Sequence, residues 1–290
     1  MITTQALQNA LKTRRSRVKL TRHWQETHDE MGVGQMAGDQ YLYLSGDDYD
    51  RLQDEYDRRT RHAPLSLDLS QDRVAVARYA ENEKTSTRQV FSGFLRVGAS
   101  HGRIFTTAAH QDICLLPNSY LSLKDPDMLD LSRYQRVLIV ENGAMMENLE
   151  GMEAILPSEY REATLYVYRG HDSSARRVSE LVSALTSTHR LGLFCDYDMA
   201  GLDIAAQYLK QRPSCPVEML APEAPDALTI QGRESLYIIQ MEMMGRVMNH
   251  TGSLPSLTRH IDTIRKARKG LTQEAMLAHR IYLCSEKISR

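Results

Sequence analysis

Blocks of apolar and polar residues alternate regularly between residues 134 and 221, and they predict strands and helices in turn. Short apolar runs typical of buried strands cover Val137–Val140, Ala163–Arg169, Leu191–Asp198 and Pro216–Ala221. The segments between them have the spacing of amphipathic helices: Ala144–Leu156, Ser174–Leu185 and Ala200–Lys210. Strands that alternate with such helices need crossover connections, so we expect a mainly parallel sheet covered by helices on both faces.

The flanking regions have weaker patterns. An apolar stripe predicts a first helix over Thr3–Lys19, and interleaved acids and bases predict a polar helix over Asp47–Arg61. Short, partly alternating segments within Asp72–Leu123 predict small strands or a winged-helix-like mixture. We therefore expect three parts: an N-terminal arm and winged-helix-like DNA-binding region (1–130), an α/β domain (131–222) and a helical C-terminal extension (223–290).

Composition narrows the class of protein. The chain has 290 residues, of which 42% are hydrophobic and 25% charged, which suits one large or two modest globular domains. Its 36 basic and 37 acidic residues nearly cancel, so any surface for nucleic acid must arise from local clustering. The four cysteines are far apart and form no CxxC pair, which indicates thiols in a reducing compartment. No apolar run approaches the ~18 residues of a membrane span, so we expect a cytoplasmic protein without a membrane partner.

Acidic residues follow two of the predicted strands. Glu141 comes directly after the first strand, and Asp196 and Asp198 end the third. Functional groups in an open parallel sheet collect beyond the carboxyl ends of the strands. Side chains alternate along an extended chain, so the two aspartates should project to one side. Neighbouring strands lie about 4.8 Å apart, so Glu141 can reach the same space if its strand lies beside the third.

Three carboxylates this close raise each other's pKa unless a cation intervenes, and neither acidic motif contains Lys or Arg. Carboxylate oxygens suit Mg²⁺ or Mn²⁺, so Glu141, Asp196 and Asp198 are candidate metal ligands and catalytic residues. Glu141 is either a third ligand or a general acid or base beside the metal. Asn142, Gly143 and Gly201 are expected to support the two turns. Strand-end acids are often only caps, but two such motifs in one array favour a metal site.

The two motifs resemble the signatures of the Toprim domain, which topoisomerases, primases and several nucleases share. They are ENGAMMENL after VLIV, which contains Glu141, and DYDMAG after LGLFC, which contains Asp196 and Asp198. The wider context is similar to the JetD (MksG) nucleases of Wadjet anti-plasmid systems and, more distantly, to the A subunit of topoisomerase VI. Residues 131–222 carry the specific resemblance, and the late GLTQEAMLAH, with Gln273 and Glu274, is similar to the JetD tail.

The resemblance implies a Rossmann-like Toprim fold, with the family's metal-binding acids at Glu141, Asp196 and Asp198. It also implies a Mg²⁺- or Mn²⁺-dependent DNA endonuclease that acts on double-stranded plasmid DNA. Such nucleases work as homodimers with the subunits of an SMC-type ATPase complex. This chain is shorter than the usual JetD in its N-terminal half, which leaves the arm and the partner contacts open.

Other functions stay open at this point. A topoisomerase-type transesterase would need a nucleophilic tyrosine, and Tyr41, Tyr43 and Tyr49 lack the preceding Arg-Asp of that group, so hydrolysis is favoured. A catalytically idle DNA-binding or assembly module and an RNA-processing Toprim enzyme are the remaining alternatives.

Secondary candidates surround these motifs. His171 and Glu274 are candidates for a supporting role near the carboxylates. Two basic clusters are candidates for binding DNA phosphates, although each is equally typical of a solvated helix face. The first cluster comprises Lys12, Arg14, Arg15, Arg17, Lys19 and Arg22, and the second comprises Arg265, Lys266, Arg268 and Lys269 with the nearby Arg259.

Overall fold

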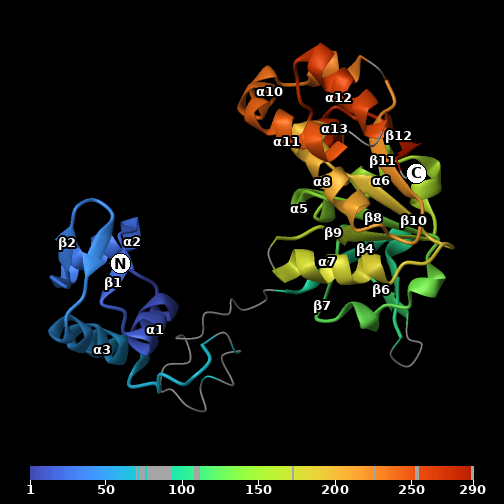
Figure 1. The fold of residues 1–290 in the computed structure, drawn as a ribbon. Coiled ribbons are helices and arrows are strands. Elements are labelled where there is room, and N and C mark those ends of the chain that lie inside the picture. The colour runs from blue at the N-terminus through green and yellow to red at the C-terminus, as the bar shows by residue number, and fades with distance from the viewer. Residues whose placement is uncertain are drawn as a thin grey trace. The chain divides into compact units, whose positions relative to one another are not determined.

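The computed structural model forms two compact units, residues 1–92 and 93–290. Figure 1 shows the ribbon of both units, and each unit has its own hydrophobic core. The structure describes the whole chain except residues 70, 72–75, 77–92, 108–111, 172, 225, 252–254 and 289–290.

In residues 1–69 the first unit combines α1, α2 and α3 with a small antiparallel sheet of strand order β1-β3-β2. Leu7, Leu42, Leu52 and Tyr56 are fully buried at its centre. Along the chain the elements are α1 (Thr4–Thr13), β1 (Arg17–Lys19), α2 (Arg22–Met31), β2 (Gln35–Ala37), β3 (Tyr41–Tyr43) and α3 (Gly46–Thr60).

The predicted first helix is too long, whereas the predicted polar helix is confirmed. Helix α1 ends at Thr13 because Arg14 adopts a left-handed conformation with φ of 40°. Val18 then pairs with Leu42 in the sheet instead of continuing the helix. Helix α3 begins one residue before the predicted start, where Ser45 and Asp48 form a capping box.

The second unit is built on a seven-stranded sheet of order β12-β11-β10-β8-β9-β4-β7. Its parallel centre consists of the four predicted strands, β8 (Arg136–Val140), β9 (Thr164–Tyr168), β10 (Arg190–Phe194) and β11 (Val217–Pro222). The outer strands are antiparallel to their neighbours: β12 (Leu283–Lys287), β4 (Leu95–Ala99) and β7 (Leu121–Leu123). The sheet is therefore of mixed orientation, with a parallel core as predicted.

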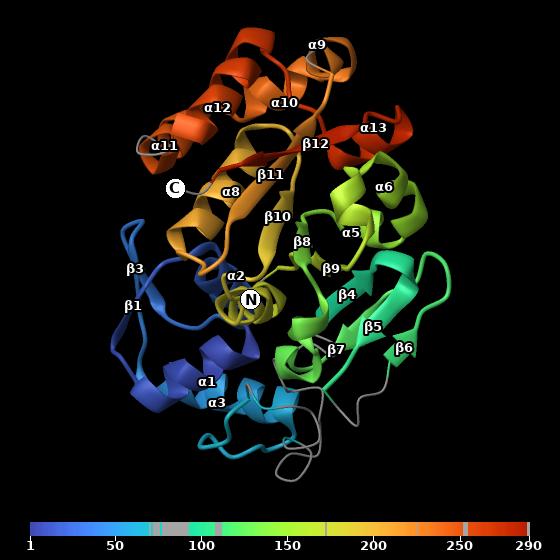
Figure 2. The ribbon, with the colours of Figure 1, turned by 90° about the vertical axis from the view of Figure 1, so that its right-hand side faces the viewer.

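Helices cover both faces of this sheet, with α5 and α6 on one side and α8 on the other (Figure 2). The segment predicted as one helix over 144–156 is two, because α5 ends at Met146 and the side chain of Asn148 caps the start of α6. The helices are α5 (Gly143–Met146), α6 (Leu149–Ile155), α7 (Ser173–Ser183), α8 (Met199–Lys210), α9 (Ala227–Gln231), α10 (Glu234–Ile239), α11 (Met241–Thr251), α12 (Pro255–Ala267) and α13 (Gln273–Ala278).

The C-terminal extension is not entirely helical, contrary to the expectation. Its last described element is β12, which pairs with β11 and so joins the extension to the central sheet. Leu283 is buried, whereas the residues that follow it on the strand are partly or fully exposed, as expected for an edge strand.

Residues 93–130 belong to the second unit, although the sequence pattern grouped them with the N-terminal region. They supply β4 and β7 to the large sheet and form a separate hairpin of β5 (Arg103–Phe105) and β6 (Asp112–Cys114). Most of the apolar segment 73–80, predicted as a strand, lies outside the described residues. Short 3₁₀ helices occupy Ser100–Gly102, Pro126–Met128, Leu131–Arg133 and Ser158–Arg161. The winged-helix-like character of the N-terminal region stays a prediction.

The cysteines are all free thiols, as expected. Cys195 and Cys215 are buried, whereas Cys114 is exposed. No helix in the described part of the chain is long and apolar enough to cross a membrane.

The connection between β10 and α8 is tight because Gly201 lies against the end of β10. A Cβ atom at position 201 would overlap the carbonyl oxygen of Asp196 and approach Cys195 to 3.2 Å. Gly143, at the start of α5, has more space. The nearest atoms to a Cβ at this position would be those of the Tyr168 ring, at 3.7 Å. Glycine is therefore required after the second acidic motif but not after the first.

We expect Gly201→Ala to lower the free energy of unfolding by about 3 kcal/mol, because the backbone of Asp196 cannot yield as a flexible side chain would. Gly143→Ala is the matched control and should change stability by less than about 1 kcal/mol. Urea unfolding of both variants measures this difference. Equal stability of the two variants would contradict the steric role of Gly201.

Candidate active site

Two of the three predicted acids meet at the carboxyl edge of the parallel strands. Glu141 follows β8, and its Oε2 accepts a hydrogen bond of 3.0 Å from the backbone N–H of Asp196, just beyond β10. The two strands pair in register, with Val140 opposite Phe194, so their ends are level. The structure therefore brings Glu141 together with Asp196, as the sequence predicted for adjacent strands.

The chain stays extended beyond β10 and keeps the two aspartates on the same side. Tyr197 lies between them and exchanges backbone hydrogen bonds of 2.8 and 3.1 Å with Leu271. Its side chain is buried and packs edge-to-face against His260. Asp196 and Asp198 consequently project away from the Tyr197 ring.

Asp198 is only 2% exposed, and both of its carboxylate oxygens accept hydrogen bonds. Oδ1 accepts from the N–H of Gly201 at 2.9 Å and so caps α8. Oδ2 accepts from Nε2 of Gln240 at 2.7 Å, while Oε1 of Gln240 accepts from the N–H of Ala200 at 3.2 Å. Gln240 lies between α10 and α11, so the C-terminal extension contacts this acid directly.

Gln273, at the start of α13, joins the two acidic motifs. Its buried side chain accepts from the N–H of Asn142 at 2.7 Å and donates to the carbonyl of Phe194 at 2.9 Å. Its backbone N–H donates to Oδ1 of Asp196 at 2.8 Å. Glu274, predicted to support the site, accepts a hydrogen bond from the side chain of Asn142. One turn of α13 therefore holds the ends of β8 and β10 together.

The electrostatics follow from burial of several acids in one place. The pKa of Asp196 is raised to about 7, mainly by burial and in addition by the charges of Glu141, Asp198 and Glu274, while the hydrogen bond from Gln273 lowers it. Burial also raises the pKa of Glu141, against the hydrogen bond from Asp196 and the charge of Arg169. The site therefore carries excess negative charge that favours a bound cation or proton.

The donor types fit Mg²⁺ or Mn²⁺, since Glu141, Asp196 and Asp198 offer the carboxylate oxygens that these ions prefer. Glu141 and Asp196 each have a second oxygen that accepts no hydrogen bond from the described residues. Within the same residues, no three His, Cys, Asp or Glu side chains are grouped closely enough to hold a metal ion.

Arg169 is the site residue that the sequence reasoning missed. It follows β9, its N–H donates to the carbonyl of Val140 at 2.8 Å, and its charge lowers the pKa of Glu141. Arg169 lies outside both acidic motifs, on the strand between them in sequence. Its position as the last residue of the predicted strand Ala163–Arg169 was the signal that could have found it.

His171 lies next to this edge but on its outer side. Its ring packs edge-to-face on Tyr168, with 6.2 Å between centroids, and the guanidinium of Arg96 lies 5.8 Å from the same ring. His171 is exposed and makes no hydrogen bond to a carboxylate of the described residues. A direct role beside the acids stays a prediction.

The chain that follows the second basic cluster passes close to Asp198. It runs from α12 through Arg268 and Lys269 to Gly270, where a Cβ atom would approach Cβ of Asp198 to 2.8 Å. The side chain of Lys269 donates to the carbonyl of Thr229 at 2.5 Å. Arg265, Lys266 and Arg268 line a pocket of about 490 Å³ together with Tyr237, Met241 and Asp262. The backbone after this cluster, at Gly270, is therefore the part that contacts the acidic site.

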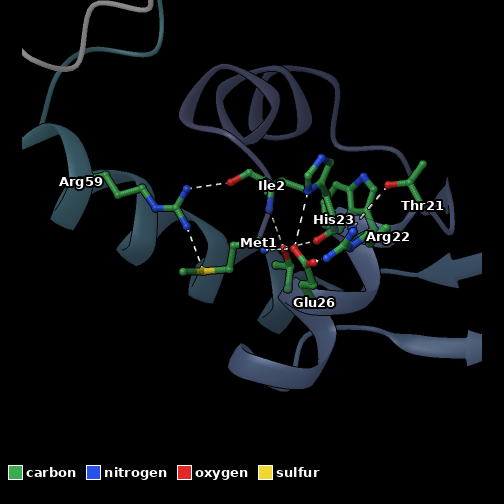
Figure 3. A network of polar contacts seen from close by, with 9 residues as sticks. Met1, Ile2, Thr21, Arg22, His23, Glu26 and Arg59 are labelled. Atoms are coloured by element: carbon green, nitrogen blue, oxygen red, sulfur yellow. Dashed lines mark hydrogen bonds and ion pairs between the residues drawn. The ribbon is translucent and has the colours of Figure 1, made fainter. Parts of the chain in front are cut away.

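The first basic cluster belongs to the N-terminal unit and is spread over several elements. Lys12 lies on α1, Arg14 and Arg15 in the following turn, Arg17 and Lys19 on β1, and Arg22 on α2. Arg22 is already paired, since its Nε donates to the carboxylate of Glu26 at 3.0 Å. The α-amino group of Met1 donates to the same carboxylate at 2.7 Å (Figure 3). Arg15, Arg17 and Lys19 line a separate pocket of about 400 Å³ beside Trp24.

The candidate tyrosine nucleophiles differ in their surroundings. Tyr49 is buried, and its hydroxyl donates to the carbonyl of Arg15 at 2.8 Å. The ring of Tyr41 lies 4.4 Å from the guanidinium of Arg17, and Tyr43 is exposed. The buried and hydrogen-bonded hydroxyl of Tyr49 is poorly placed to attack a phosphodiester.

A family model described as "Domain of unknown function (DUF7281)" matches residues 93–285. This range covers most of the second unit, including Glu141, Asp196, Asp198 and Glu274. No curated protein matches the chain.

The raised pKa of Asp196 predicts an unusual pH dependence of stability when no divalent ion is added. The folded carboxyl holds its proton up to pH of about 7, whereas the unfolded carboxyl loses it near its ordinary value of 3.8. Between these values the folded state binds more protons, so the free energy of unfolding should fall as pH rises, by at most about 1.4 kcal/mol per pH unit from this group.

Urea unfolding of the wild type and of Asp196→Asn across this range measures the effect. Asp196→Asn should lack the fall in the free energy of unfolding that titration of Asp196 causes. Compared with the wild type, the variant should therefore gain stability as the pH rises to about 7. Identical slopes in the two proteins would contradict the raised pKa.

Proposed function

The chain belongs to the family described as a domain of unknown function (DUF7281), and from its acidic site we propose that it is a divalent-metal-dependent DNA endonuclease. The observation that carries the proposal is the contact between Glu141 and Asp196 at the ends of two adjacent parallel strands. Asp198 follows Asp196 by two residues, and burial raises the pKa values of both Glu141 and Asp196. Such a cluster is expensive to bury, which favours a functional reason for it.

The residues around the cluster suit a phosphodiester substrate. Glu141, Asp196 and Asp198 would hold the metal ion, which when bound supplies Lewis-acid polarisation of the phosphodiester. Glu141 has an unused oxygen and a raised pKa, so it is the candidate to accept a proton from the attacking water. Gln273 and Gln240 keep the acids oriented, and the basic segment beside Asp198 offers contacts to the DNA backbone.

We assign the finer identity by resemblance. A Glu after the first strand and a DxD motif after the third, with these two strands adjacent, agree with a Toprim-type catalytic domain. A JetD-like role in plasmid defence, with an SMC-type ATPase complex and a homodimeric nuclease, is part of this proposal. Hydrolysis is favoured over tyrosine transesterification because the hydroxyl of Tyr49 is buried and hydrogen-bonded.

Nicking of supercoiled plasmid in the presence of Mn²⁺ tests the activity. Glu141→Gln and Asp196→Asn should each reduce the rate by a factor on the order of 10²–10⁴, because each removes a charged oxygen ligand or the proton acceptor. Glu147→Gln is the matched control: it makes the same chemical change six residues after Glu141, at an exposed position, and should keep the wild-type rate.

DNA retention by the Glu141 and Asp196 variants, measured by fluorescence anisotropy with Ca²⁺, should stay close to that of the wild type. Full nicking activity in both variants would end the nuclease proposal. Trapping of a tyrosine-linked DNA adduct on denaturation would favour the transesterase instead.

Metal binding is testable without DNA. Mn²⁺ at 100 times its dissociation constant should stabilise the folded wild type by about 2.7 kcal/mol, because the ion binds only the assembled site. Thermal unfolding with and without Mn²⁺ measures this stabilisation. Asp196→Asn should weaken it and Glu147→Gln should not. The same stabilisation in all three proteins would place the metal elsewhere.

A further inference from the structure

We propose that Arg169 binds the scissile phosphate, with its guanidinium donating to the non-bridging oxygens of the phosphodiester. This inference rests on the proposed nuclease function and adds to it a residue outside both acidic motifs. Arg169 would supply a positive charge that belongs to the protein, in addition to any bound metal ion.

The strand register places Arg169 at the same edge as the acids. Strand β8 lies between β10 and β9, and Val140 is level with both Phe194 and Tyr168. The next residue on each strand therefore emerges at the same height. Glu141 and Arg169 follow Val140 and Tyr168, and the N–H of Arg169 donates to the carbonyl of Val140 at 2.8 Å.

Gly170 follows Arg169 directly, two residues after the end of β9. Its φ of 68° is in the left-handed region, and a Cβ there would approach Cβ of Ser174 to 2.6 Å. Arg169 therefore lies between β9 and a turn that residues other than glycine would strain. This geometry restrains the backbone from which the guanidinium extends.

The guanidinium of Arg169 is not satisfied by the fold. Its Nε is buried, yet it has no hydrogen-bond partner among the described residues. No ion pair joins it to Glu141 or to another acid in that part of the chain, although its charge acts on Glu141. Arg190, at the opposite edge of the sheet, differs from Arg169 because its guanidinium forms an ion pair with Glu218 at 2.6 Å. An unmet buried donor costs free energy, which a bound anion would recover.

Phosphate is the anion that suits this position. A guanidinium presents a planar fork of N–H donors that matches two phosphate oxygens, whereas a lysine offers only a point charge. A phosphodiester brought to several carboxylates meets like charge, and a neighbouring arginine offsets this repulsion. Arg169 is the basic group whose charge acts on Glu141.

Arg136 provides a matched control within the same sheet. It lies at the start of β8, at the other end of the strand from Glu141, and its Nε is also buried without a partner among the described residues. Its guanidinium lies 5.8 Å from the Tyr160 ring. Arg136→Gln and Arg169→Gln therefore make the same chemical change at opposite edges of the sheet.

The test uses the full chain, supercoiled plasmid and Mn²⁺, with circular dichroism to confirm folding of each variant. Arg169→Gln should lower kcat on the order of 100-fold or more, because a donor to the reacting phosphate is lost. Arg169→Lys should recover only part of this rate, since lysine lacks the fork. Arg136→Gln should keep the wild-type rate. Guanidinium ions in solution should partly restore nicking by Arg169→Ala but not by Glu141→Gln.

The outcomes separate this inference from the function on which it depends. If the wild type nicks plasmid and Arg169→Gln does so at the same rate, phosphate binding by Arg169 is overturned and the nuclease function stands. Full recovery by Arg169→Lys, without rescue of Arg169→Ala by guanidinium, would show that the residue only balances charge. Absence of nicking by the wild type with either Mn²⁺ or Mg²⁺ would overturn both proposals.

Discussion

In-register pairing of β8 with both β10 and β9 is the constraint on which the site depends. Parallel strands direct their carboxyl ends to one edge, and level ends bring the following residues within reach of each other. Glu141, Asp196 and Arg169 therefore share a small volume although long stretches of sequence separate them. A shift of one residue in either pairing would move these side chains to the other face.

Holding like charges together has a cost, and local hydrogen bonds offset part of it. Each buried acid accepts at least one backbone N–H: Glu141 from Asp196, Asp196 from Gln273, and Asp198 from Gly201. These bonds orient the carboxylates while burial raises the pKa values of Glu141 and Asp196. The result is a rigid set of oxygens with an affinity for protons or cations.

The C-terminal extension completes the site rather than merely covering the sheet. Gln240 contacts Asp198, Gln273 spans the ends of β8 and β10, and Gly270 leaves room for the chain to pass Asp198. Strand β12 fixes the end of this extension to β11. The orientation of the acids therefore depends on residues that follow the last parallel strand.

The sequence by itself determined the four parallel strands, the helices between them and the positions of Glu141, Asp196 and Asp198 at strand ends. Strand and helix periodicity is local, and an acid placed directly after a buried run marks a strand end without knowledge of the partner strand. Strand β12, the pairing of β4 and β7 with the large sheet, the break between α5 and α6 and the early end of α1 were missed. Edge pairing and single capping residues leave almost no trace in hydrophobic periodicity.

Only the tertiary structure decided which strands are neighbours and which distant residues reach the acids. Strand order gave Glu141 its contact with Asp196 and brought Arg169 to the same edge. Gln240 and Gln273 are ordinary polar residues in the sequence, and their role arises only from the path of the chain. Contacts between residues far apart in sequence depend on the packing of the whole unit, which no local pattern encodes.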